Sequence, residues 1–450
     1  MRPALDLAQP ASSIADLVGY FRASCTPADR LRVGTEHEKI GLLEDTLTPL
    51  PYHGPRSVAA MLERLATEGG GRLVREGAAP IALEMGTHQI TLEPGAQVEL
   101  SGAPLATVHE FASELREHMA ALREVSDPLG VTWIGLGYRP FGPRAAVPWV
   151  PKRRYDIMRP YLATRGRRAH DMMQMTATVQ ANLDFTDEED CARKMRAAMS
   201  ATSLVTALFA SSPLEDGHDT GFLSWRAAAW HETDPDRCGI LPFVWDADFG
   251  FRRYAEWALD VPMFFVRREG AYRPGLGTTF RRFMQEGFEG LRPTLEDWET
   301  HLSTLFPEMR LKNYVEVRGA DAGPLELVTA LPALCKGILY DREALDATER
   351  LMSDVPLGER LRLRAEVPRA ALRTPLGRGT VGDRARELVA IAREGLRRQA
   401  ALDGDGRDES RFLDPLEEIA AQGRCHAERV LEVWRRAPGD VRALMDTIRL

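Results

Sequence analysis

Cysteine is scarce in this sequence, and its few thiols stand far apart. The chain of 450 residues has an odd number of cysteines and no CxxC pair, with thiols at Cys25, Cys191, Cys238, Cys335 and Cys425. Zinc knuckles need closely spaced cysteine pairs, and disulfide frameworks use an even number in short secreted chains. The pattern indicates neither and fits a protein of the reducing cytoplasm.

Long apolar runs and an excess of basic charge are also missing. No stretch approaches the roughly eighteen apolar residues of a membrane helix, and the N-terminal MRPALDLAQPASSIADLVGYF lacks the charged-then-apolar pattern of a secretion signal. The formal net charge of -8, from 66 acidic and 58 basic side chains, gives no general attraction to nucleic acid or anionic membranes. We expect a cytoplasmic protein that acts on small molecules, as a monomer or a homodimer.

The spacing of hydrophobic, capping and turn residues predicts helices and strands that are mixed rather than strictly alternating. The predicted helices are at 12–24, 55–71, 104–125, 189–210 and 294–306, and the predicted strands at 32–42, 89–102 in two pieces around Pro94 and Gly95, 131–140, 176–185, 260–268 and 310–321. Several strands alternate polar and apolar residues, as half-covered antiparallel sheets do. We therefore predict an α+β core at 1–336, with a mostly helical region at 337–450 packed on it.

The strand RVGTEHEKIGL, residues 32 to 42, carries two glutamates in a segment otherwise suited to burial. Successive side chains of a strand point to opposite faces, so Glu36 and Glu38 project to one side and His37 to the other. Other strand-like segments also carry polar residues at alternate positions, which place them on one face of the strand. These residues are Glu93, Gln97 and Glu99 in one segment, Gln180 in the next, and Glu316 with Arg318 in the last.

Carboxylates that gather on one buried face repel each other, which is tolerable when cations neutralise them. Oxygen donors without paired cysteines or histidines suit a hard ion, Mg²⁺ or Mn²⁺. The alternative is that each glutamate faces solvent on an exposed strand.

A series of ordered blocks extends over nearly the whole chain. They include GTEHEK (34 to 39), LEPG-Q-ELSG (92 to 102), PK-RY (151 to 155), TVQ-NLDF (178 to 185), GFLS-R---W (221 to 230) and HLST-FPE-RLK-Y-E-RGAD (301 to 321). In order and spacing they resemble the glutamate-cysteine ligases of the plant and proteobacterial type. The resemblance implies a glutamine-synthetase-like core, an antiparallel sheet curved into a funnel. It also implies an activity, in which ATP phosphorylates the γ-carboxylate of glutamate and the amine of cysteine then attacks.

The same resemblance assigns roles to individual residues. Mg²⁺ would be held by Glu36, Glu38, Glu93, Glu99, Gln180 and Glu316. Arg154 would lie near the transferred phosphate, Arg318 would reach phosphate or carboxylate, and Lys152 and Lys312 would contact the nucleotide. Arg226 and Trp230, one helical turn apart, would bind the α-carboxylate end of glutamate. Without the resemblance, Lys152 and Arg154 would be a solvated basic loop, Trp230 a core aromatic and Arg318 an ion-pair partner of Glu316.

The expected substrate walls depart from the family pattern. Met175 replaces an arginine, Ala177 a cysteine, Phe264 a tyrosine and Leu325 a tryptophan. We predict that Met175 and Phe264 are nevertheless substrate-binding positions. Loss of a guanidinium and a hydroxyl removes hydrogen-bonding anchors, so the alternative function is the same chemistry with a different small amine as acceptor.

Overall fold

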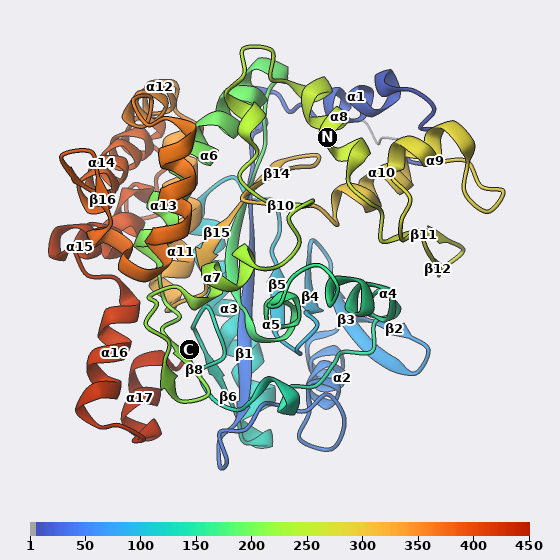
Figure 1. Ribbon diagram of the computed structural model, residues 1–450. Helices are drawn as coiled ribbons and strands as arrows, with labels where there is room; N and C mark the ends of the chain where they lie inside the picture. Colours follow the sequence, from blue (N-terminus) through green and yellow to red (C-terminus); the bar gives the residue numbers. More distant parts are fainter. Residues whose placement is uncertain (1–5) are drawn as a thin grey trace.

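The computed structural model describes residues 6–450 and is built around one antiparallel sheet of nine strands. Eight strands follow the order β14-β15-β7-β1-β5-β4-β3-β2, and β6 pairs with β1. Their bounds are β1 Val33–Leu43, β2 Arg72–Glu76, β3 Ala79–Met85, β4 His88–Leu92, β5 Val98–Ser101, β6 Val131–Ile134, β7 Thr178–Leu183, β14 Met309–Leu311 and β15 Val315–Asp321. Figure 1 shows β1 running through the centre of the molecule.

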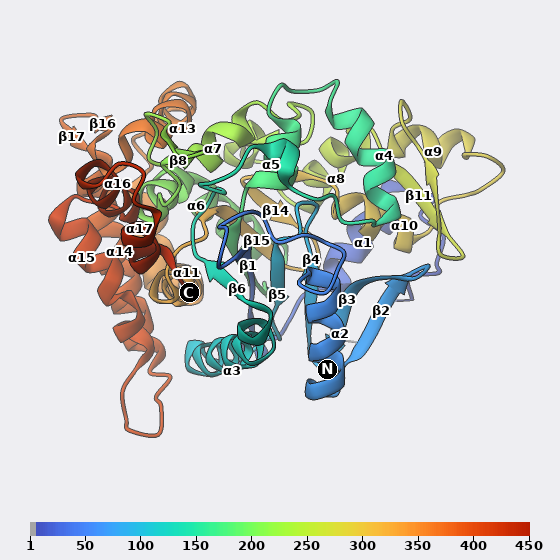
Figure 2. The same cartoon turned by 90° about the horizontal axis from the view of Figure 1, so that it is seen from below.

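Helices surround this sheet (Figures 1 and 2). The helices before the last third of the chain are α1 Ile14–Ala23, α2 Val58–Gly69, α3 Val108–Ser126, α4 Arg153–Leu162, α5 Ala169–Met175, α6 Glu188–Phe209, α7 Trp225–His231, α8 Phe251–Asp260, α9 Phe280–Glu286 and α10 Leu295–Leu302. Those that follow are α11 Leu325–Leu339, α12 Arg342–Leu351, α13 Leu357–Ala370, α14 Val381–Gln399, α15 Asp414–Gln422, α16 His426–Arg436 and α17 Val441–Ile448. In both views the helices after α11 gather on one side of the sheet.

Four pairs of short strands lie outside the main sheet. They are β8 Leu214–Glu215 with β9 His218–Asp219, β10 Cys238–Gly239 with β13 Phe306–Pro307, β11 Phe265–Arg268 with β12 Ala271–Pro274, and β16 Pro375–Leu376 with β17 Gly379–Thr380. The five cysteines are free thiols. Within residues 6–450 no helix has the length and apolar character needed to cross a bilayer.

The sheet confirms the predicted α+β class and corrects two details. Residues 310–321 were expected as one strand but form the hairpin β14–β15, because Lys312, Asn313 and Tyr314 make the turn. The hairpin β2–β3 was missed, because β2 is exposed or half-exposed along its whole length and β3 has a continuous buried run without alternation. Thr294 caps α10, as predicted, and completes a capping box with Asp297.

The C-terminal helices are anchored to the rest of the chain by a buried ion pair. Lys336 of α11 donates to Glu409, 2.8 Å away, and Glu409 accepts at 2.6 Å from the backbone amide of Val108 at the start of α3. The predicted division at residues 336 and 337 falls within α11, which also packs on β7 and α14. The division into a core and a C-terminal region stays a prediction.

A tight turn joins β4 to β5 and carries Glu93. The backbone amide of Ala96 donates to the carbonyl of Glu93 at 2.9 Å. The side chain of Gln97 accepts from the amide of Gly95 and donates to the carbonyls of Met173 and Thr176 at the end of α5. Gln97, which shares the parity of the glutamates, therefore fixes the turn.

We predict that Gly95→Ala is destabilising, because a Cβ at Gly95 would lie 2.2 Å from the backbone carbonyl oxygen of Gln174. Such a clash should lower the free energy of unfolding by about 1–3 kcal/mol. The control is Ala96→Gly at the next position, where φ is +62°. That change relieves backbone strain and removes one methyl group, so stability should shift by less than about 1 kcal/mol. Denaturant unfolding measures both, and equal stability of Gly95→Ala and the parent would contradict the packing described.

Candidate active site

Ten of the fourteen predicted site residues line one cavity of about 240 Å³ on the polar face of the sheet. They come from strands β1, β5, β7 and β15, the β4–β5 turn, α7, and the start of α4 with the residue before it. These residues are Glu36, Glu38, Glu93, Glu99, Lys152, Arg154, Gln180, Arg226, Trp230 and Arg318.

Strand register brings the glutamates together. Glu38 on β1 is paired with Glu99 on β5, and Glu36 is paired with Gln180 on β7. Paired residues of an antiparallel sheet point to the same face, so segments far apart in sequence present their carboxylates to one space. His37 is fully buried on the opposite face, beside Lys39 and His118, as its parity predicted.

Neutral groups hold two of these carboxylates in place. Glu99 accepts from the hydroxyls of Thr91 at 2.8 Å and Ser101 at 2.6 Å, and Glu38 accepts from the backbone amide of Thr178 at 3.0 Å. These contacts orient the carboxylates, and all three donors are uncharged.

Burial and mutual repulsion raise the pKa of all four glutamates. The pKa of Glu36 is raised to about 7 by burial, by Glu316 and by Glu99, and the pKa of Glu38 is raised well above its usual range by burial, Glu93 and Glu99. The pKa values of Glu93 and Glu99 are raised chiefly by burial as well.

This donor set fits a hard divalent cation, which would supply the missing positive charge. Over the described part of the chain, no three acidic, histidine or cysteine side chains converge closely enough to form a ready-made metal site.

Glu316 and Gln180 are engaged by arginines. Glu316 is fully buried and pairs with Arg310 at 2.6 Å and with Arg318 at 2.8 Å. Arg310 lies directly opposite it on β14, and both arginines help to lower the pKa of Glu316 to about 2. Arg318 also donates to the side-chain oxygen of Gln180 at 2.7 Å. Arg318 is therefore the ion-pair partner of Glu316 here, and Glu316 does not line the cavity itself.

The helix α7 presents Arg226 and Trp230, and its predicted helical geometry is confirmed. The guanidinium of Arg226 donates to the carbonyl of Arg318 at 3.0 Å, and its centre lies 5.9 Å from the ring of Trp230. The Nε of Arg226 and the indole Nε1 of Trp230 are buried without a hydrogen-bond partner among the described residues. These two hydrogen-bond donors lie on one wall of the cavity and can together bind a carboxylate.

Asp321 positions α7, a role that the sequence analysis did not predict. Its buried carboxylate accepts from the hydroxyls of Ser212 at 2.6 Å and Ser224 at 2.8 Å, and lies 4.0 Å from Arg226. Ser224 is also the N-cap of α7. The only available signal was the RGAD block, which contains Asp321 but does not show what it contacts.

The two lysines lie at different places. Lys152 lines the cavity, where Glu93 favours its charge but burial lowers its pKa overall. Arg154, at the start of α4, has a buried Nε without a partner in residues 6–450. Lys312 sits in the β14–β15 turn and donates to the hydroxyl of Tyr314 at 2.9 Å, outside this cavity.

Met175 and Phe264, expected at the substrate, do not line the cavity. Phe264 is 1% exposed and packs against Tyr161 and the guanidinium of Arg237, 4.0 Å from its ring. Met175 is also 1% exposed, in a small apolar cluster with Tyr138. Both side chains are drawn into apolar packing. Neither of these two residues therefore forms part of the wall of the cavity.

A second, larger cavity of about 860 Å³ adjoins the first at Glu36, which lines both. Its walls are the loop before β1, the ends of β1 and β7, and the β14–β15 turn, represented by Arg32, Gly34, Asn182, Asn313 and Tyr314. Its volume is in the range of pockets that hold whole small-molecule ligands.

Comparison with known proteins agrees with this geometry. The model of glutamate-cysteine ligase family 2 matches residues 32–447. The chloroplastic glutamate–cysteine ligase of Arabidopsis thaliana is 42% identical over 422 residues, covering 93% of this chain and 79% of that protein. Chloroplastic glutamate–cysteine ligase B of Oryza sativa subsp. japonica is 42% identical over 429 residues, 94% of this chain and 85% of that protein.

A solved structure shares the fold. The glutamate–cysteine ligase of Francisella tularensis in complex with AMP superposes with a TM-score of 0.56 at 11% identity, covering 93% of this chain and 87% of that one. The sequence match extends over almost every element described above. The chain belongs to glutamate-cysteine ligase family 2.

Proposed function

We propose that this protein uses ATP to join the γ-carboxylate of glutamate to the amine of cysteine, which is the first step of glutathione synthesis. The observation that carries the proposal is the single cavity lined by the carboxylates of Glu36, Glu38, Glu93 and Glu99 and also by Arg154, Arg226 and Trp230. The carboxylates suit metal-bound phosphates, and the two idle donors on α7 suit the α-carboxylate of an amino acid.

Glu36, Glu38, Glu93 and Glu99 would hold Mg²⁺ or Mn²⁺ through carboxylate oxygens. A bound divalent cation supplies the charge that offsets the nucleotide phosphates and the γ-carboxylate. Gln180 and Glu316 would join the set when Arg318 releases them and turns to a phosphate or carboxylate oxygen. Arg318 is suited to this exchange because its planar fork pairs with two oxygens at once.

The residues of the cavity position the reactants for two successive nucleophilic substitutions. An oxygen of the γ-carboxylate attacks the terminal phosphorus of ATP, and the bond to ADP breaks. Arg154 pairs with the transferred phosphoryl group, whose charge it stabilises. The neutral amine of cysteine next attacks the acyl carbon, phosphate leaves with its bonding electrons, and the nitrogen loses a proton. The wall formed by Met158, Met172 and Met173 offers polarisable surface to the acceptor thiol.

The larger cavity is our proposed location for the base and ribose of the nucleotide. Glu36 lines both cavities, so a nucleotide in the larger one would extend its phosphates past Glu36 toward Glu38 and Arg154. Lys312, beside this cavity in the β14–β15 turn, would contact the phosphates. We also propose a cytoplasmic location, in keeping with the free thiols.

The activity is tested by ADP formation from ATP, Mg²⁺ and glutamate, with and without cysteine, and by mass detection of the product. We expect ADP formation to depend on cysteine and to match formation of γ-glutamylcysteine. Cysteine-independent ADP formation, with an amide appearing only when another small amine is supplied, would replace this proposal with the alternative acceptor.

The metal role is tested by Glu38→Gln, which keeps the shape of the side chain and removes its charge. We expect the Mg²⁺ concentration for half-maximal activity to rise about 10- to 100-fold, because one of the charged ligands is lost. Glu117→Gln on the exposed face of α3 is the matched control and should behave as the parent. An unchanged Mg²⁺ requirement in Glu38→Gln would remove this glutamate from the metal site.

The nucleotide position is tested at Tyr314, which lines the larger cavity. Tyr314→Ala removes the ring and should raise KM for ATP about tenfold or more, since an aromatic contact with a base is worth about 1–3 kcal/mol. Tyr314→Phe keeps the ring and should change KM for ATP less than threefold. Similar KM values for ATP in the parent and Tyr314→Ala would show that the base binds elsewhere.

A further inference from the structure

A surface cleft of about 660 Å³ lies between the end of α13, the helix α16 and the loop that leads into α7. Its volume is in the range of pockets that hold small-molecule ligands. The apolar residues that line it are Phe222, Leu223 and Leu431. We call it the α13–α16 cleft, and it shares no residue with the active-site cavity described above.

The α13–α16 cleft is positively charged, although the formal net charge of the whole chain is -8. Five arginines line it against three carboxylates, which is an excess of two positive charges. Such a local excess attracts ions of the opposite sign. The carboxylates are already paired with four of the arginines, Glu432 with Arg424 and Arg436, Asp219 with Arg435, and Glu428 with Arg373.

The fifth arginine, Arg369, has its binding capacity open. Its guanidinium centre lies 3.9 Å from the centroid of the Phe222 ring, and within residues 6–450 no carboxylate pairs with it. Stacking on the ring leaves the N–H groups at the edge of the guanidinium available, and this planar group pairs with two oxygens of a phosphate or carboxylate at once. The four paired arginines also keep N–H groups, because each guanidinium has five.

The loop before α7 connects this cleft to the active site. Leu223 lines the cleft, and Arg226, three residues later, lines the active-site cavity. The backbone amides of Leu223 and Ser224 both donate to the carbonyl of Pro368 in α13, at 2.7 and 2.9 Å. Because Ser224 is the N-cap of α7, the attachment of this loop to α13 fixes where α7 begins.

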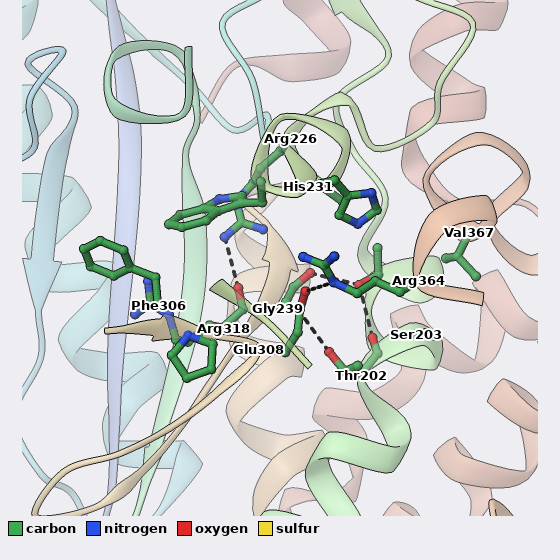
Figure 3. A pocket seen from close by; sticks show the side chains of 15 residues that line it. Thr202, Ser203, Arg226, His231, Gly239, Phe306, Glu308, Arg318, Arg364 and Val367 are labelled. Carbon is green, nitrogen blue, oxygen red and sulfur yellow. Dashed lines mark hydrogen bonds and ion pairs between the residues drawn. The ribbon is translucent and has the colours of Figure 1, made fainter. Parts of the chain in front are cut away.

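Helix α13 also reaches both places. It carries Arg369 into the cleft, and five residues earlier Arg364 donates to Glu308 at 2.9 Å. Figure 3 shows Arg364 and Glu308 in contact beside a small cavity that Arg226 also lines. A ligand in the cleft would therefore contact the two segments that also surround Arg226.

We infer that the α13–α16 cleft binds a small molecule with two or more phosphate or carboxylate charges, and that its occupancy weakens glutamate binding. Negative charge added next to the segments around Arg226 opposes the binding of an anionic substrate there. Binding couplings are reciprocal, so glutamate must weaken the anion by the same factor. The existence of the site is independent of the proposed function, whereas its effect on glutamate rests on it.

The experiment titrates inorganic pyrophosphate and, separately, citrate into the full-length protein by calorimetry, in metal-free buffer of low ionic strength. We expect a Kd of about 1 mM or tighter for at least one of them, and the tighter one shows whether phosphate or carboxylate is preferred. Arg369→Gln should weaken that anion about 10-fold, because its open guanidinium is lost. Arg64→Gln, at an exposed position of α2, is the matched control and should keep the parental Kd.

Two further titrations place the anion and test the coupling. Arg154→Gln changes the active-site cavity and should leave the Kd of the anion unchanged. Saturating L-glutamate should weaken the anion about threefold or more in the parent.

The outcomes are distinct. If neither anion binds, or if Arg154→Gln weakens binding and Arg369→Gln does not, the site in the cleft is overturned. If the anion binds through Arg369 and glutamate leaves its Kd unchanged, the effect on glutamate is overturned and the site stands. Direct titration of glutamate separates this result from a failure of the proposed function, in which glutamate itself does not bind.

Discussion

Repulsion among buried carboxylates is the constraint on which the rest of this structure depends. Glu36, Glu38, Glu93 and Glu99 share one cavity, and burial together with their neighbours raises the pKa of each. Such an arrangement costs folding free energy, so the surrounding structure must hold it in place. The long strand β1, paired on both sides, fixes two of these side chains, and the turn tied to α5 by Gln97 fixes a third.

The carboxylates in and around this cavity fall into two groups, those that pair with arginine and those that accept hydrogen bonds from neutral groups. Where a carboxylate belongs to the framework, it has an arginine partner, as Glu316 has in Arg310 and Arg318 and as Asp321 has in Arg226 at 4.0 Å. Where it faces the cavity, it has only neutral partners, as Glu38 and Glu99 have. The contrast separates structural charge from charge that is left for ligands.

The C-terminal helices contribute charged residues both to the packing of the core and to the surroundings of the cavity. The buried pair Lys336 and Glu409 joins α11 to the start of α3, and Arg364 of α13 reaches Glu308 beside the cavity. The helical region is thus part of the wall near α7 and more than a cover over the core.

The sequence by itself determined the α+β class, most of the elements and the shared face of Glu36 and Glu38, because side chains alternate in any strand and hydrophobic spacing is local. It could not show that residues 312–314 turn, nor that Arg310 therefore faces Glu316 across a hairpin. Only the tertiary structure buried Met175 and Phe264 in apolar clusters and gathered Thr202, Glu308, Gly319 and Arg364 around one small cavity. The physical reason is that register, burial and cross-element contacts depend on the packing of segments up to hundreds of residues apart, which no local pattern records.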